Sequence, residues 1–279
     1  MLECAALFVH SFMNRENKMG KPISENHAID VASFIVVFER PFEPSIIGSL
    51  SGLHERLKKD YPTFSLTNTM EVSITGSEVN QKVGVTSGGI LQNLLPDGRP
   101  NWTLRVEGNA IVVSCTEYKR WEDISFKALE HIKAAIAFVN DDNNAISSLI
   151  HQIVDRFVTD NKDEYKISQV FNTESPYLTK QALKAGKFWH VFQGWFEEKD
   201  DYGAKLLNVL NLSTAENPAN TTITTTIDHA AHLRFLSPKA IKEFDDEFIR
   251  KAFDELHECN KTIIKQLLTN DQLNTIGLK

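Results

Sequence analysis

The sequence has few cysteines, and they do not form a recognisable pattern. Cys4, Cys115 and Cys259 are the only three, and no two of them make a CxxC pair. An odd number of widely spaced cysteines fits neither a disulfide framework nor a zinc site. This usage is typical of a reduced intracellular protein with small buried thiols. The sequence therefore predicts a cytoplasmic location.

The chain also lacks a surplus of positive charge and a long hydrophobic run. It has 30 Lys and Arg residues against 37 Asp and Glu residues, a net charge of −7. Proteins that bind nucleic acid through its phosphates usually carry a basic surplus, so nucleic acid is not an expected partner. No stretch approaches the roughly 18 consecutive apolar residues of a membrane-spanning helix. A membrane is not an expected partner either.

Catalytic signatures are missing as well. The chain contains no HExxH and no GxSxG motif, and the glycine-rich residues 84–89 lack the lysine and the spacing of a phosphate-binding loop. No cofactor and no metal are predicted.

What the sequence does contain is one layout of elements that occurs twice, over residues 28–140 and 145–279. Each half is predicted to run strand, helix, several antiparallel strands, long helix. In the first half these are a strand at 29–38, a helix from Pro44 to just before Pro62, a hairpin at 102–115 that turns at Gly108, and a helix at 121–139. Strands are also expected near residues 63–74 and 88–95.

The second half is predicted to open with a strand at 146–158, because that segment mirrors residues 29–38. Three further strands are predicted at 188–197, 204–213 and 221–235, the last because its first six residues are all β-branched. Ser237 and Pro238 are a favourable N-cap and first helical residue. The final helix is therefore expected to cover residues 238–268, about 46 Å at 1.5 Å per residue.

These patterns predict an α+β fold in which two βαβ…βα repeats form curved antiparallel sheets backed by long helices. The expected organisation is an N-terminal extension at 1–20, a first repeat at 21–142 and a second at 143–279. Antiparallel sheets bury one face under helices. The other, concave face is then left free to bind something.

The densest group of polar candidates is Asp228, His229 and His232. On a strand, Asp228 and His232 share one face and His229 points to the other. Three ligands would not converge on one metal without a bulge, so the simpler interpretation is polar residues on a sheet. An unrecognised enzyme centred on Asp228 and His232 remains an alternative.

The second candidate is an aromatic strand. Phe188, His190 and Phe192 share one face by alternation, and Trp189 shares the other with Val191; Trp195 and Phe196 follow. One face is expected to pack in the core. The other offers aromatic side chains of the kind that anchor protein interfaces. The candidate binding residues are Trp189, His190, Phe192, Trp195, Asp228 and His232.

Several short stretches resemble a sporadically distributed, uncharacterised prokaryotic protein family of about 250–280 residues. They are Arg40-Pro41 after the first strand, residues 58–61, residues 118–122 with Phe126, Ile227-Asp228, and Leu256-His257 leading to Leu268-Thr269. The resemblance covers roughly residues 21–279. It provides no catalytic residues, and it implies a role linked to mobile elements or antiviral defence.

The sequence thus predicts a non-enzymatic binding protein, and the resemblance implies an accessory component of a defence or toxin-associated system. Its expected partner is another protein or a second copy, with the C-terminal helix as one route to a homodimer. The first alternative is a small-ligand sensor with a pocket between the sheet and the long helix. The second is the enzyme considered above.

Overall fold

The computed structural model describes residues 20–24, 26–68, 71–75, 78–82, 86–139 and 144–278. The predicted extension and the predicted boundary at 142/143 lie almost entirely outside these residues. The strands are β1 (Lys21–Pro22), β2 (Ile29–Phe38), β3 (Thr63–Asn68), β4 (Glu71–Thr75), β5 (Glu78–Lys82), β6 (Thr86–Leu94), β7 (Pro100–Glu107), β8 (Ala110–Cys115), β9 (Ala145–Thr159), β10 (His190–Lys199), β11 (Ala204–Asn217) and β12 (Thr222–Ala240). The α-helices are α1 (Pro44–Gly48), α2 (Leu50–Leu57), α3 (Trp121–Val139), α4 (Lys180–Lys184), α5 (Asp246–Leu267) and α6 (Asn270–Thr275).

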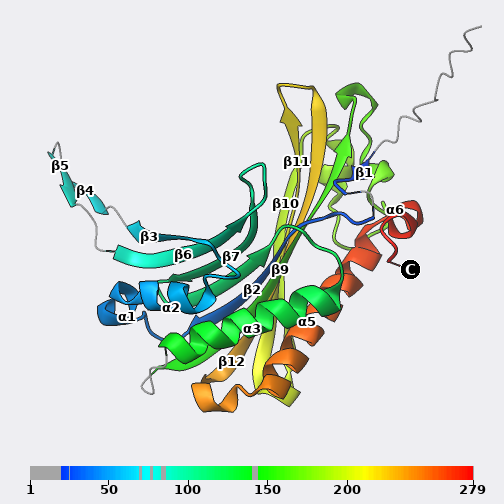
Figure 1. Ribbon diagram of the computed structural model, residues 1–279. Coiled ribbons are helices and arrows are strands. Elements are labelled where there is room, and N and C mark those ends of the chain that lie inside the picture. The colour runs from blue at the N-terminus through cyan, green and yellow to red at the C-terminus, as the bar shows by residue number, and fades with distance from the viewer. Residues whose placement is uncertain are drawn as a thin grey trace, which may run out of the picture.

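The fold is α+β, as predicted. The described residues form a ten-stranded antiparallel sheet in the order β10-β11-β12-β9-β2-β8-β7-β6-β3, with β1 paired to β9. Within the described residues, β4 and β5 form a separate two-stranded sheet. The two central strands, β2 and β9, come from different halves of the chain, and each half extends outward from its own central strand (Figure 1).

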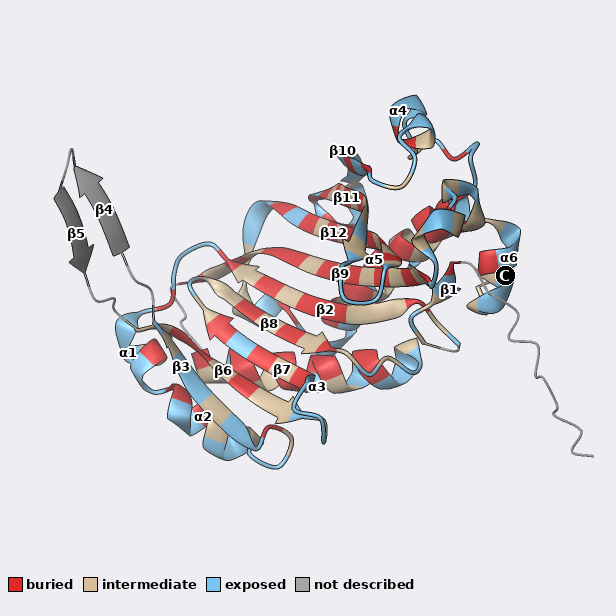
Figure 2. Cartoon of the chain, turned by 90° about the horizontal axis from the view of Figure 1, so that it is seen from above, coloured by how far each residue is buried: buried red, intermediate tan, exposed pale blue. Residues whose placement is uncertain are grey.

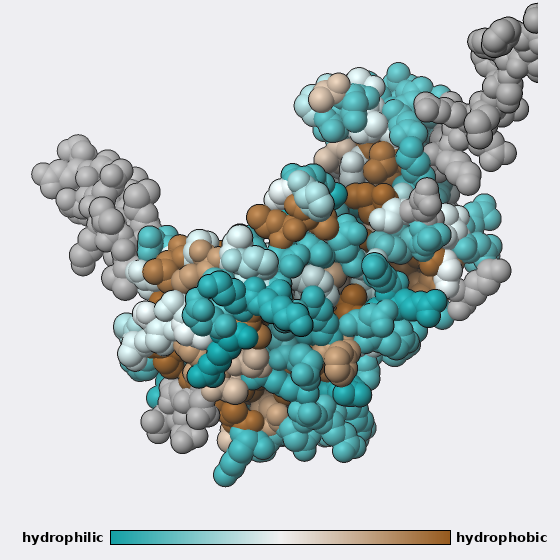
Figure 3. Space-filling view, in the orientation of Figure 1, coloured by the Kyte–Doolittle hydropathy of each residue, from teal (hydrophilic) through white to brown (hydrophobic). Residues whose placement is uncertain are grey.

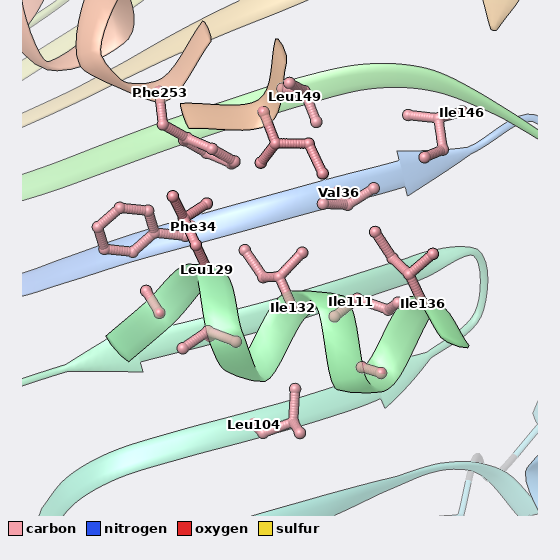
Figure 4. Close-up of a cluster of buried hydrophobic side chains, with 14 of the residues drawn as sticks. Phe34, Val36, Leu104, Ile111, Leu129, Ile132, Ile136, Ile146, Leu149 and Phe253 are labelled. Atoms are coloured by element: carbon pink, nitrogen blue, oxygen red, sulfur yellow. The ribbon is translucent and has the colours of Figure 1, made fainter. Parts of the chain in front are cut away.

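The long helices α3 and α5 pack against one face of this sheet (Figure 1). Amphipathic spacing explains why: α3 buries Ile124, Leu129, Ile132 and Ile136 on one side. These side chains meet alternate residues of the strands in one core that draws on both halves of the chain (Figure 4). The residues drawn there include Phe34, Val36, Leu104, Ile111, Ile146, Leu149 and Phe253.

The opposite face of the sheet, called here the open face, carries none of the described helices. Figure 2 looks onto it, with α3 and α5 passing behind the strands. Buried and half-buried residues alternate along β9 and β12, because the helices cover only every second side chain. Half-buried residues of the open face are shielded by their neighbours within the sheet.

Most of the predicted elements are confirmed. The segment 146–158 is a strand, the hairpin at 102–115 forms with Gly108 at φ +60°, and the three strands of the second half lie where they were expected. The predicted helix at 44–61 is interrupted at Ser49, which separates α1 from α2.

The start of the last helix was predicted wrongly. Ser237 and Pro238 lie in β12, which continues to Ala240, and α5 begins only at Asp246. The actual N-cap is Asp245, whose side chain accepts a hydrogen bond from the backbone N–H of Phe248 at 2.8 Å. Asp245 caps the helix in place of Ser237, eight residues earlier, because β12 keeps pairing with β9 beyond Pro238. The helix has 22 residues, and it ends at Leu267.

None of the helices that the structure describes is both long enough and apolar enough to cross a membrane.

Candidate functional site

The edge strand β10 presents aromatic side chains to solvent. Phe192 and Phe196 are 68% and 58% exposed, and Phe188, just before the strand, is also exposed. Alternation places Phe192 and Phe196 on the open face, where they pair with Asn211 and Leu207 of β11. Gly194 lies between them and has no side chain. The strand thus carries two exposed rings separated by a gap.

The other face of β10 is part of the core, as predicted. Trp189 is only 7% exposed and donates its indole N–H to the hydroxyl of Tyr165 at 3.1 Å. Trp195 is half-buried, stacks on Tyr177 with ring centroids 5.2 Å apart, and donates to Glu197 at 3.0 Å. Neither tryptophan shares a surface with Phe192. The six candidate residues therefore divide between the two faces of the sheet.

The remaining four candidates lie on the open face. His190 is exposed, with Nε2 2.8 Å from Oδ1 of Asn211. Asp228 accepts a hydrogen bond from Nε2 of Gln152 at 2.8 Å. His232 is half-buried, and burial is the main cause that lowers its pKa, followed by the charge of Arg234.

Asp228 and His232 do not form an acid–base pair. They are four residues apart on one extended strand, which separates them by about 13 Å at 3.3 Å per residue. An acid and a base acting on one proton must lie within hydrogen-bond reach of each other or of one water. His229 lies on the opposite, helix-covered face, as the alternation predicted, and is fully buried. Within the described part of the chain, no group of three His, Cys, Asp or Glu residues is arranged to hold a metal ion.

An apolar row crosses the open face. Residues paired across successive strands form it from β10 to β8: Phe196, Leu207, His232, Ile150, Ile35 and Val112. His232 is its one polar member. Figure 3 shows hydrophobic side chains gathered over the β10 and β11 region, among hydrophilic ones. The apolar character therefore continues from the edge strand to the centre of the sheet.

The charges on the open face balance. Among the residues described there, the basic side chains are Arg105, Arg156, Lys205 and Arg234, and the acidic ones are Asp30, Glu107, Glu198 and Asp228. Several are already paired: Arg156 contacts Asp30 at 3.0 Å, and Lys205 contacts Glu198 at 3.0 Å. A face without net charge has no electrostatic attraction for a phosphate backbone.

A layer of buried polar residues lies between the sheet and the helices, and the sequence patterns did not predict it. His229 has Nε2 3.1 Å from Oδ1 of Asn208 and Nδ1 3.2 Å from Nδ2 of Asn260. This arrangement defines a neutral imidazole that donates from Nε2 and accepts at Nδ1. Burial lowers the pKa of both His229 and His151 to about 3. His151 looks like an isolated polar residue in the sequence, and only the pairing of β9 with β12 brings it near His229.

A cavity of about 140 Å³ opens beside this layer, between β2, β9, α5 and the C-terminal segment. Asp155 and His257 line it and are almost completely buried. Oδ2 of Asp155 and Nδ1 of His257 have no hydrogen-bond partner among the described residues, and neither has Nδ1 of His27, which also lines the cavity. The remaining lining is mostly aliphatic: Ala28, Ile29, Ile264, Ile276 and Leu278.

A scan against models of known protein families found no match to this chain, and a search of curated proteins found none either.

Proposed function

We propose that this protein works by binding other proteins and that β10 is the strand through which it binds. The observation that carries the proposal is the pair of exposed rings, Phe192 and Phe196, on an edge strand of ten residues. An edge strand offers unpaired backbone N–H and C=O groups to a strand of another chain. Native proteins usually protect such edges with proline, bulges or short length. Strand β10 contains no proline, and its pairing with β11 has an unbroken register.

The occupant we propose is β10 of a second copy, paired antiparallel about Gly194. In that register the two Gly194 residues face each other. Phe192 of each copy then faces Phe196 of the other, which makes two aromatic pairs. Cross-strand aromatic pairs of this kind contribute about 0.5 to 1 kcal/mol each. His190 of one copy faces Glu198 of the other, so no acidic side chain faces another acidic side chain at either end.

The register also explains why the charged residues of β10 do not block pairing. Glu197, Glu198 and Lys199 are confined to its last three positions, so like charges never face each other in the self-paired strand. Glu197 is already engaged within its own chain, where it accepts from Nδ2 of Asn208 at 2.9 Å. The two open faces would then join into one continuous surface.

The C-terminal helix is a less suitable dimer surface. Its apolar stripe, which includes Ile249, Phe253, Leu256 and Ile263, is already buried within the same chain. We therefore place self-association at β10 and not at α5.

We infer in addition that the sheet consists of two matching units. In the first half the opening strand β2 pairs with the last strand β8, followed outward by β7 and β6. In the second half β9 pairs with β12, followed by β11 and β10. Each half closes with a long helix on the same face. Two free thiols, Cys115 and Cys259, agree with the cytoplasmic location that the sequence predicts. A role in defence remains a prediction based on the resemblance alone.

Sedimentation equilibrium over a range of protein concentrations tests the proposal. The wild-type chain is expected to form a dimer, and the double variant Phe192→Asp/Phe196→Asp is expected to remain a monomer at every concentration. Leu66→Asp is the matched control, because Leu66 is 50% exposed on the opposite edge strand β3. That variant should dimerise normally.

Two results would contradict the proposal. One is a wild-type chain that stays monomeric at high concentration. The other is a dimer that survives both aspartates. Circular dichroism of the double variant should match the wild type, since both substituted residues lie in solvent.

A further inference from the structure

The cavity beside Asp155 has the features of a built binding site. Asp155 lies on β9, His257 on α5 and His27 just before β2, so three separate segments place a polar atom at one cavity. Buried polar groups are nearly always hydrogen-bonded in folded proteins. Oδ2 of Asp155, Nδ1 of His257 and Nδ1 of His27 have no partner among the described residues. Three such atoms around one cavity indicate a missing partner.

The chemistry of these atoms specifies that partner. An ionised carboxylate is an acceptor only, and a neutral imidazole accepts at one nitrogen. No basic side chain of the described residues forms an ion pair with Asp155. Lys261 also lines the cavity, but its ammonium group is bonded to Glu258 at 2.7 Å. A buried carboxylate without a counter-charge is costly, and a cationic ligand would remove that cost.

The size and walls of the cavity limit the ligand further. A volume of about 140 Å³ is close to that of an engineered protein cavity that accepts benzene. It holds a molecule of roughly five to eight non-hydrogen atoms. Ile29, Ile264 and Leu278 supply aliphatic surface away from the carboxylate. The site therefore combines one anionic end with an apolar end.

We propose that this cavity binds a small aliphatic ammonium ion, with the ammonium group on Asp155 and the hydrocarbon tail among the isoleucines and Leu278. The imidazoles of His257 and His27 accept hydrogen bonds from the remaining N–H groups, directly or through water. Burial raises the pKa of Asp155 to about 7, because the ionised carboxylate has no counter-charge beside it. A bound ammonium ion would supply that counter-charge. Tyr118 and Lys261 are the other titratable residues that line the cavity.

Three probes of one shape test the proposal: isobutylamine, isobutanol and isobutyrate, which are cationic, neutral and anionic near pH 7.5. Binding is measured by NMR titration of the labelled protein at constant ionic strength. For ligands of this size we expect a dissociation constant of roughly 1 mM. Isobutylamine is expected to bind at least tenfold more tightly than isobutanol, and isobutyrate not at all.

The variant Asp155→Asn keeps the shape of the side chain and removes its charge. It is expected to weaken isobutylamine binding at least tenfold and to leave isobutanol unchanged. Asp160→Asn is the control, because Asp160 is exposed and pairs with Lys21 outside the cavity. That variant should bind as the wild type does.

Equal affinity for the three probes would overturn the proposal, as would an amine affinity that Asp155→Asn leaves unchanged. The absence of saturable amine binding up to about 50 mM would do the same and would mean that the cavity holds only water. The cavity lies on the helix-covered side of the sheet, away from Phe192 and Phe196. This inference and the proposed dimer therefore fail or succeed independently.

Discussion

The two faces of the sheet are made by the same strands, yet they differ in what they bury. The covered face carries large apolar residues such as Phe34 and Phe157 together with the ionisable residues His151, Asp155 and His229, all at or below 4% exposure. Away from its edge aromatics, the open face carries β-branched residues such as Ile35, Ile150 and Val112 and charged residues of both signs. Alternation decides which residue faces which side, and the helices decide which side becomes the interior. The buried histidines and Asp155 therefore lie between the sheet and the helices, whereas Phe192 and Phe196 are exposed on an edge strand.

The largest expected effect is a loss of folding stability at low pH, and it comes from the covered face. His131, His151, His229 and His257 are buried on the covered side, and burial lowers the pKa of each to between about 3 and 4. The unfolded chain takes up these protons near pH 6.5, whereas the folded chain resists them. Stability should therefore fall as the pH drops below 6.5, by about 2 to 3 kcal/mol per histidine at pH 4.5. Asp155 acts in the opposite direction, because its raised pKa stabilises the folded state as the pH falls, but it is one group against four.

Denaturant unfolding at pH 7 and pH 4.5 measures the effect. His151→Gln should reduce the pH dependence by about one proton. Leu66→Ala, which removes an exposed side chain that cannot titrate, should leave it unchanged. Equal stability at the two pH values would show that the histidines are not held neutral in the interior.

A matched pair of phenylalanine truncations compares the two faces by packing alone. Phe253 on α5 is fully buried, with its ring 5.3 Å from that of Phe34. Phe253→Ala should cost about 3 to 5 kcal/mol of unfolding free energy, the usual penalty for a large core residue. Phe192→Ala should cost less than about 0.5 kcal/mol, because its ring is in solvent. Chemical denaturation of dilute monomer gives both values, and similar losses would mean that Phe192 belongs to the core.

The sequence predicted the elements better than it predicted the interior. Segment 146–158 had ambiguous spacing, and it was assigned as a strand only because it mirrors residues 29–38; that assignment is confirmed. Helix α5 was extended too far toward its N-terminus, since a local cap signal at Ser237 says nothing about how long β12 remains paired. Local patterns determine strands and helices, but not where tertiary pairing ends.

The candidate site shows the same limit. Alternation correctly separated His190 and Phe192 from Trp189, and Asp228 and His232 from His229. It gave no hint of Asp155 or His257, because a single acid on a strand and a single histidine on a helix carry no signal. Their proximity depends on the packing of α5 across β9, 102 positions apart in the chain at these two residues.

The most direct test of the central claim is amide hydrogen exchange along β10 measured at increasing protein concentration. The β10 amides that point away from β11 are expected to exchange quickly in dilute solution and to become protected as dimers form. Amides of the opposite edge strand β3 should exchange at a rate independent of concentration. If β10 shows no such dependence, or if protection appears on α5 in its place, then β10 is not the strand that binds.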